Sequence, residues 1–203
     1  MRNHEKNKVQ VIAYSAILMA LSIVLTRMFS IMIPIPGIGN SLRVGFGAIP
    51  TIIAGLLFGP VAGGIVGGGS DIIGVLINPM GPAIHPGFTF TAMLTGIIPG
   101  LVVGAYGKKL GIHSIQVLQD KKYLTRSIIM TVVLRAIIVE MILNTIWLTN
   151  LMGASFVVLF PPRAVKAIAI LIIHGLILRG IMGALKEAGV LKSFSRRLGT
   201  KTA

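Results

Sequence analysis

The chain contains no cysteine and very few acidic residues. Its 203 residues include five Asp and Glu, against 19 Lys and Arg. Without cysteine the protein forms neither disulfides nor thiolate metal sites. Charged residues of both signs make up 12% of the chain, whereas a soluble domain needs about 25% to cover its surface. With 54% hydrophobic residues and a mean hydropathy of +0.90, the composition is typical of an integral membrane protein.

The sequence also lacks a nucleotide-binding loop. No G-x-x-x-x-G-K-[ST] motif occurs, although 25 residues are glycine. Several of the glycines instead recur at four-residue spacing, as in Gly55-x-x-x-Gly59 and Gly63-x-x-x-Gly67, a pattern that indicates close contacts between membrane helices. Any ATP hydrolysis that this protein needs must therefore come from another protein.

The net charge of +14 would suggest nucleic acid as a partner for a soluble protein, but the positions of the charges argue against it. Fourteen of the 19 basic residues precede the first apolar segment, lie in or just after the connection 107–123, or lie in the C-terminal part from Arg179 onward. This positive-inside pattern predicts a multi-pass protein of the cell membrane with both termini in the cytoplasm. The basic connection suits anionic lipid headgroups or an acidic partner surface.

Hydropathy and helix breakers divide the chain into six predicted transmembrane helices within one membrane domain, residues 1–203. The predicted spans are 9–29, 46–58, 61–77, 87–106, 124–150 and 163–185. The basic start and the apolar run that follows resemble a signal peptide, but no A-x-A cleavage site follows the run, so we predict an uncleaved first span. Within it, Ala16 and Ala20 form a small-x-x-x-small pair, which serves either internal packing or docking of a partner subunit.

Two loops on the outer side interrupt the spans. Residues 30–45 contain two prolines and several glycines, so they cannot form a regular helix. Their apolar side chains favour a lid over a binding site rather than a loop resting on helix ends. The second loop, 78–86, contains His85, which as a lone histidine does not make a metal site.

The stretch from Arg135 to Lys166 carries the most polar residues within apolar sequence. We predict an outer hairpin of two helices, with a turn that ends in Pro161-Pro162. Its first helix carries Glu140, Asn144 and Trp147 at i, i+4 and i+7, a spacing that places them on one face. Arg163 and Lys166 share a face of the second helix. Polar faces in lipid are costly unless they line something polar, so the site is expected here.

Asp71 and Arg135 both lie near the predicted middle of the membrane. An ion pair between them would lower the cost of burying both charges. Arg135 is expected to have this structural role, whereas for Asp71 a contact with a ligand is an equal alternative.

A set of motifs that covers nearly the whole chain resembles the folate-specific S component of energy-coupling-factor (ECF) vitamin transporters. The glycine-rich motifs are shared by several S components, and the fifth and sixth motifs indicate the folate branch. The motifs are Arg43-Val-Gly-Phe-Gly with Ile49-Pro50, Ala54-Gly-Leu-Leu-Phe-Gly-Pro-Val-Ala-Gly, Ser70-Asp71-Ile-Ile-Gly, Pro86-Gly-Phe-Thr, Leu143-Asn-Thr-Ile-Trp and Pro162-Arg-x-x-Lys.

The resemblance implies a six-helix, all-α membrane subunit that captures folate at the outer face. It implies docking on a transmembrane T subunit bound to two ATPases, through Ala16 and Ala20. Segment 30–45 would act as the gate of the site. No cofactor or metal is implied on this chain, since ATP is used by the partner ATPases.

The chemistry of folate assigns candidate roles to the polar residues. The edge of the pterin ring suits Asp71 and Asn144, and its flat face suits Trp147 with Phe88. The two glutamate carboxylates suit cations at the outer rim. The candidate cations are Arg43, Arg163 and Lys166. His85 and Arg27 are further candidates for contact with the substrate. Snorkelling at a helix end is the alternative for Arg163 and Lys166, and an interfacial aromatic belt for Trp147.

Two other functions compete with folate binding. An S component for pantothenate, a pyrimidine or a cobalamin precursor fits the same scaffold. An intramembrane serine protease would pair Ser70, in Gly68-Gly-Ser70-Asp71, with His174. No oxyanion-hole donors accompany that second pattern, so the prediction is that the protein is not an enzyme.

Overall fold

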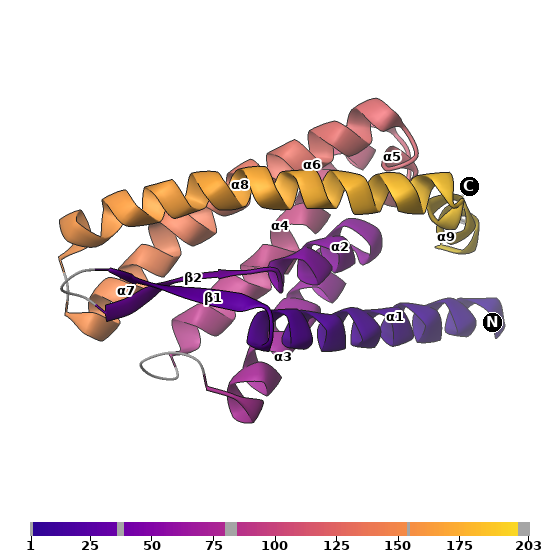
Figure 1. Ribbon diagram of the computed structural model, residues 1–203. Coiled ribbons are helices and arrows are strands. Elements are labelled where there is room, and N and C mark those ends of the chain that lie inside the picture. The colour runs from indigo at the N-terminus through magenta and orange to yellow at the C-terminus, as the bar shows by residue number, and fades with distance from the viewer. Residues whose placement is uncertain (1, 36–38, 80–84, 154, 199–203) are drawn as a thin grey trace.

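The computed structural model describes residues 2–35, 39–79, 85–153 and 155–198. The chain forms an elongated bundle of helices with one β-hairpin (Figure 1). In chain order the elements are α1 (Arg2–Arg27), β1 (Ser30–Ile35), β2 (Gly39–Gly45), α2 (Ala48–Phe58), α3 (Pro60–Ile77), α4 (Pro86–Leu110), α5 (Ser114–Val117), α6 (Lys121–Arg135), the π-helix η1 (Ala136–Leu143), α7 (Asn144–Met152), α8 (Phe156–Glu187) and α9 (Val190–Leu198).

The expected all-α membrane fold is confirmed, with six apolar helical segments in the predicted order. Five segments of the described chain are long and apolar enough to cross a membrane: 8–27, 60–77, 86–110, 121–151 and 156–187. The sixth, α2, has 11 residues and at 1.5 Å per residue reaches only about 17 Å, short of the ~30 Å hydrocarbon layer. Both ends of the chain lie at the same end of the bundle (Figure 1).

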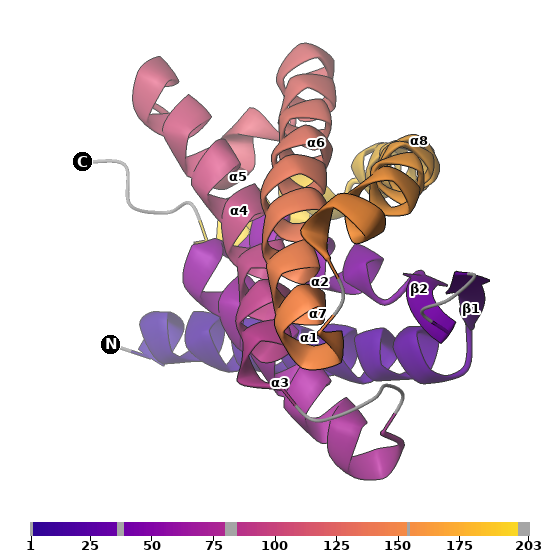
Figure 2. The ribbon, with the colours of Figure 1, turned by 90° about the vertical axis from the view of Figure 1, so that its left-hand side faces the viewer.

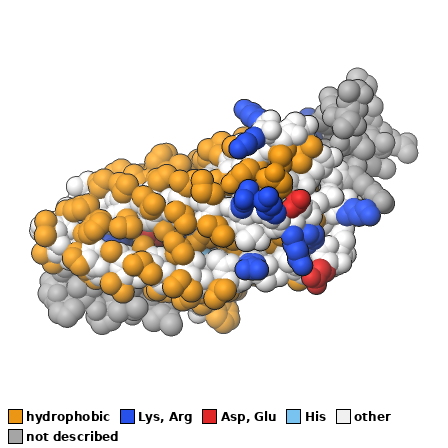
Figure 3. Space-filling model, turned by 90° about the horizontal axis from the view of Figure 1, so that it is seen from above, with side chains coloured by type: hydrophobic (Ala, Val, Ile, Leu, Met, Phe, Trp, Pro, Cys, Tyr) orange, Lys and Arg blue, Asp and Glu red, His pale blue; other side chains and the backbone are white. Residues whose placement is uncertain are grey.

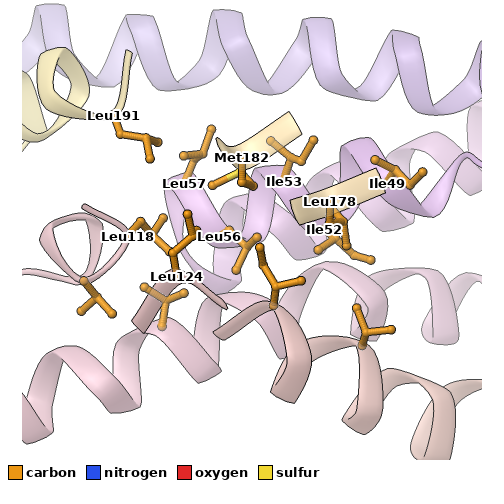
Figure 4. Close-up of a cluster of buried hydrophobic side chains, with 14 residues drawn as sticks. Ile49, Ile52, Ile53, Leu56, Leu57, Leu118, Leu124, Leu178, Met182 and Leu191 are labelled. Atoms are coloured by element: carbon orange, nitrogen blue, oxygen red, sulfur yellow. The ribbon is translucent and has the colours of Figure 1, made fainter. Parts of the chain in front are cut away.

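Helix α2 forms the centre of the molecule instead of facing lipid. Its Ile52 and Leu56 are 0% and 1% exposed. They belong to a cluster of 14 buried residues to which α4, α5, α6, α8 and α9 also contribute, and which we call the inner core (Figure 4). Because neighbouring helices shield α2 on several sides, the short helix does not need to match the thickness of the membrane.

The glycine pattern produces the close helix contacts that its spacing predicts. A Cβ atom on Gly96 of α4 would overlap the carbonyl oxygen of Gly63 in α3, and one on Gly67 would overlap that of Ala92. Helices α3 and α4 therefore approach backbone to backbone, which only glycine allows at these positions.

The described parts of the segment 30–45, residues 30–35 and 39–45, are non-helical, as predicted, but they are more regular than the expected loop. Strands β1 and β2 pair antiparallel, with Ser30 opposite Gly45 and Ile33 opposite Leu42. The pairing is irregular between Ile33 and Ile35, where Pro34 has no N–H group to donate. Pairing of the strands satisfies backbone groups that an irregular loop would have left open.

The predicted turn at Pro161-Pro162 is wrong. Helix α7 ends at Met152, followed by Gly153 in the left-handed conformation with φ 63°, and α8 begins at Phe156, so both prolines lie inside α8. Proline's fixed φ near −65° is compatible with a helix, and glycine is the residue that most easily reverses the chain after a helix. The turn therefore forms at the glycine, several residues before the prolines.

Candidate functional site

Most of the candidate binding residues lie in the half of the molecule away from the termini. The hairpin, α7 and the start of α8 meet at this distal end (Figures 1 and 2). The half near the termini contains the inner core, and the 14 basic residues of the positive-inside pattern belong to the segments predicted at that end. The polar groups buried at the distal end thus need a separate explanation.

Three aromatic side chains gather where α4 begins. His85 precedes α4, and its Nδ1 accepts a hydrogen bond of 3.1 Å from the Gly87 backbone N–H. The His85 ring lies 5.5 Å from Trp147 and 5.8 Å from Phe88, centroid to centroid. A Cβ on Gly87 would lie 2.5 Å from the indole ring, so glycine is required for the indole to lie against α4. We call His85, Phe88 and Trp147 the aromatic cluster.

Asn144 joins α7 to α4 beside this cluster. Its Oδ1 lies 3.1 Å from the Thr91 hydroxyl, which also donates to the carbonyl of Phe88 at 2.8 Å. Trp147 is one turn further along α7, and its Nε1 is buried without a hydrogen-bond partner among the described residues. A side-chain amide and a buried indole N–H therefore lie beside or within the aromatic cluster.

A group of buried charges connects η1 with α8. Glu140 accepts from Arg135 at 2.8 Å and from Lys166 at 2.9 Å. Arg135 in turn lies 3.2 Å from Nδ1 of His174, whose Nε2 lies 3.2 Å from the carbonyl oxygen of Gly45, where β2 ends. Arg163 also interacts electrostatically with Glu140. We call Arg135, Glu140, Arg163, Lys166 and His174 the ion cluster.

The π-helix explains why Arg135 and Glu140 can pair. Residues five apart in an α-helix point about 140° away from each other. In a π-helix, i→i+5 bonding places residue i+5 nearly over residue i. Segment Ala136–Leu143 is π-helical, so Glu140 lies on the same side as Arg135. The predicted common face of Glu140 with Asn144 and Trp147 is therefore wrong for Glu140, which contacts α8 rather than α4.

Arg163 has unused hydrogen-bonding capacity in a buried position. The residue is 5% exposed, and its Nε and Nη1 atoms have no hydrogen-bond partner among the described residues. Glu140 serves both ion pairs found in the described part of the chain, while three cations surround it. A buried excess of positive charge is unfavourable unless an anion completes it. The ion cluster is thus suited to receive an anionic group.

The expected pair of Asp71 with Arg135 is wrong. Asp71 accepts a hydrogen bond of 2.7 Å from Thr89, and the cation on which it acts electrostatically is Arg27. Arg27 donates to the Asn78 carbonyl at 2.6 Å. Similar depth in the membrane did not bring Asp71 and Arg135 together, because α3 contacts α1 and α4 whereas Arg135 faces α8.

The remaining predicted residues lie apart from the two clusters or outside the described side chains. Ala16 and Ala20 lie on an exposed face of α1, so they are not used for packing within the chain. The side chain of Arg43 is outside the described residues, and only its place in β2 opposite Met32 is described. Arg27 and Asp71 contact Asn78 and Thr89, respectively, and so lie in a separate polar region where α1, α3 and α4 adjoin.

Sequence reasoning missed Thr91 and His174 as parts of the site region, and gave Arg135 a different partner. Thr91 was detectable, since it lies three residues after Phe88 on the same helix face. The role of His174 was not, because its neighbours Arg135 and Gly45 are distant in sequence.

Ser70 and His174 do not form a catalytic pair. The Ser70 hydroxyl donates to the carbonyl of Gly67 at 2.9 Å, and both ring nitrogens of His174 contact the groups named above. A serine nucleophile requires a base within hydrogen-bond reach of its hydroxyl. The serine protease alternative is therefore excluded by the geometry.

The sequence matches the family described as "ECF transporter, substrate-specific component" over residues 10–191. The chain belongs to this family. ECF substrate-specific components are multi-pass proteins of the cell membrane and subunits of transporters, not enzymes. Both the predicted family and the predicted absence of enzymatic activity are thereby confirmed.

Individual relatives agree with this assignment. The chain is 36% identical over 173 residues to the folate transporter FolT of Clostridium novyi (strain NT), covering 85% of this chain and 88% of that protein. Its fold matches the crystal structure of FolT bound with folic acid, with a TM-score of 0.66 and 26% identity over 85% of this chain and 92% of that one. The structure of the S component of a bacterial ECF transporter matches with a TM-score of 0.56 and 24% identity, over 88% of this chain and 99% of that one. This second structure agrees in fold.

Proposed function

We propose that this protein is the folate-binding S component of an ECF transporter, which captures the vitamin at its distal end for ATP-driven uptake. The observation that carries the proposal is the ion cluster, in which buried Arg163 presents two nitrogen atoms that no described residue hydrogen-bonds. Folate ends in a glutamate with two carboxylates, the kind of group that such a site accepts. The likeness to FolT over most of the chain supports the same substrate.

The rest of folate suits the aromatic cluster. A flat pterin ring stacks on indole and phenyl faces, and the cluster combines Trp147 with Phe88 and His85. The edge of the pterin requires hydrogen-bonding groups, and the candidates beside the cluster are the amide of Asn144 and Nε1 of Trp147, which no described residue hydrogen-bonds. In this assignment the ring binds between α4 and α7, and the carboxylates bind toward α8.

Transport further requires partners, because the chain contains no nucleotide-binding motif. We infer a transmembrane T subunit and two ATPases, with ATP used on those subunits and no cofactor on this chain. The exposed Ala16 and Ala20 on α1 are the proposed contact with the T subunit, since a small-x-x-x-small face lets another helix approach closely.

The first test is titration of the purified chain with folate, followed by tryptophan fluorescence. Trp147 is the only tryptophan, so the signal reports one position. The expected result is saturable quenching at one folate per chain, with no response to pantothenate. A response to another vitamin alone would retain the S-component assignment but contradict folate, and a response to no vitamin would contradict the proposed site.

A further inference from the structure

A groove runs between α6 and α8 on a side of the molecule that the proposed site does not use. Its volume is about 230 Å³, and its lining comes from five residues of each helix: Thr125, Ile128, Ile129, Val132 and Val133, and Leu171, Ile172, Gly175, Leu176 and Arg179. Along α6 this lining covers eight residue steps, or about 12 Å. Helix α1, the proposed docking helix, lies on the opposite side of the bundle from α6 (Figures 1 and 2).

Gly175 helps to make the groove hollow. A Cβ atom built on Gly175 would meet nothing within 4 Å, unlike the glycines between α3 and α4. Its φ is not in the positive range, so the backbone does not require glycine either. Glycine weakens a helix relative to alanine, and neither packing nor conformation explains its presence here. Its effect is to leave space in the wall of the groove.

The groove has the chemistry of an amphiphile's binding site. Its floor is apolar and buried, with Ile128 and Val132 at 3% and 2% exposure. Its one charged residue, Arg179, stands at the end nearer the termini, and Arg126 is exposed one residue after the lining residue Thr125. No carboxylate among the described residues forms an ion pair with either arginine.

The surrounding surface has the same polarity. Figure 3 views the side that carries α6 and α8, where hydrophobic side chains cover most of the surface and Lys and Arg gather in the half toward the termini. This basic half is the cytoplasmic one by the distribution of positive charge. Arg179 therefore stands near the level of the inner-leaflet headgroups.

We propose that this groove binds one anionic phospholipid of the inner leaflet, with an acyl chain along the apolar floor and the phosphate at Arg179. Basic pockets between transmembrane helices on the cytoplasmic side hold anionic headgroups in this way. A helix of a protein partner fits less well, because a helix about 10 Å across exceeds a groove of this volume. A flexible acyl chain enters it and fills the space beside Gly175.

The test is lipid retention measured by native mass spectrometry. The purified full chain is mixed with equal amounts of phosphatidylglycerol and phosphatidylcholine, and the lipid that remains bound is identified. Wild type is expected to retain one phosphatidylglycerol. Arg179→Gln is expected to reduce the preference for phosphatidylglycerol about fivefold, the contribution of one basic residue at the membrane surface.

Gly175→Leu fills the groove and is expected to lose the retained lipid. Gly180→Leu is the matched control, because Gly180 lies on the same helix, also faces open space and does not line the groove. Retention by Gly175→Leu equal to wild type, or equal retention of both lipids by wild type, overturns the proposal. The proposal is also overturned if Gly175→Leu no longer assembles with the T subunit but still retains the lipid. That result would indicate that the groove binds a protein partner instead. If Gly175→Leu does not fold, Arg179→Gln tests the proposal by itself. The side chain of Arg179 is exposed, so its replacement is expected to leave the fold intact, and an unchanged lipid preference would overturn the proposal.

Discussion

The two halves of the molecule bury very different side chains. The inner core near the termini consists of aliphatic residues from six helices, with Ile52 and Leu118 fully buried. The distal half buries five charged or ionisable groups of the ion cluster, and three nitrogen atoms of Arg135 and Arg163 have no hydrogen-bond partner within the described ranges. Apolar packing stabilises the fold whether or not a ligand is bound, whereas buried polar groups without hydrogen-bond partners lower the stability of the ligand-free protein. The contrast indicates that the first half contributes only to the fold, whereas the second half combines stabilising ion pairs with polar groups that are suited to bind a ligand.

The largest expected effect is a loss of stability when Glu140, the only acidic member of the ion cluster, is replaced. Glu140→Gln removes the carboxylate that pairs with Arg135 and Lys166, and leaves the cations buried without compensation. Breaking a buried ion pair from one side costs about 3–5 kcal/mol. We expect thermal unfolding of the ligand-free protein at a clearly lower temperature than wild type. An unchanged unfolding temperature would mean that the cluster does not contribute to the fold.

The inner core should show stability effects without binding effects. Leu56→Ala removes a side chain that is 1% exposed, and such truncations cost about 2–5 kcal/mol. The affinity of the fraction that remains folded should equal that of wild type. A calorimetric titration with folate, below the unfolding temperature, checks this. A large loss of affinity would contradict the separation of the two halves.

Arg163→Ala should give the opposite result. Because Nε and Nη1 have no hydrogen-bond partner among the described residues of the ligand-free protein, its stability should fall far less than that of Glu140→Gln. Folate binding should weaken about ten- to a hundredfold, since a hydrogen bond between charged groups contributes roughly 1.5–3 kcal/mol.

A pterin that lacks the glutamate is the control ligand for Arg163→Ala. Its affinity should be unchanged in the same titration, because it has no carboxylates to lose. Equal losses for both ligands would place Arg163 at the ring rather than at the carboxylates.

The smallest effect on the purified chain is expected at the exposed face of α1. Ala20→Trp changes a surface position, where stability typically varies by about 0.5 kcal/mol or less. Folate binding by the purified protein should persist, while uptake by cells that contain the complete transporter should stop. A substitution on the same helix at exposed Ile12, outside the Ala16–Ala20 pair, provides the comparison. Loss of binding in Ala20→Trp would instead point to packing within the chain.

The sequence predicted the order of the apolar helices and the close helix contacts of the glycine-rich segments, since both follow from local patterns, but it did not predict that α3 and α4 are the pair that approaches most closely. It also predicted Asn144 and Trp147 as neighbours, and these do face α4 together. The partner of Arg135 was not predictable, because a π-helix shifts which residues share a face, and apolar composition does not indicate where a π-helix forms. The hairpin was missed because Pro34 and nearby glycines argue against regular strands, while pairing with β2 compensates for them.

The buried nitrogen atoms of Arg163, which have no hydrogen-bond partner among the described residues, have a consequence for the stability of the protein in the membrane. A ligand that binds the folded chain but not the unfolded chain stabilises the folded state by mass action. The gain is about 2.7 kcal/mol when the free ligand concentration is a hundred times the dissociation constant. A ligand that neutralises surplus charge also relieves a repulsion that the empty protein must bear. The lifetime of this subunit in the membrane would then depend on the supply of its vitamin, and starved cells would hold the shorter-lived form.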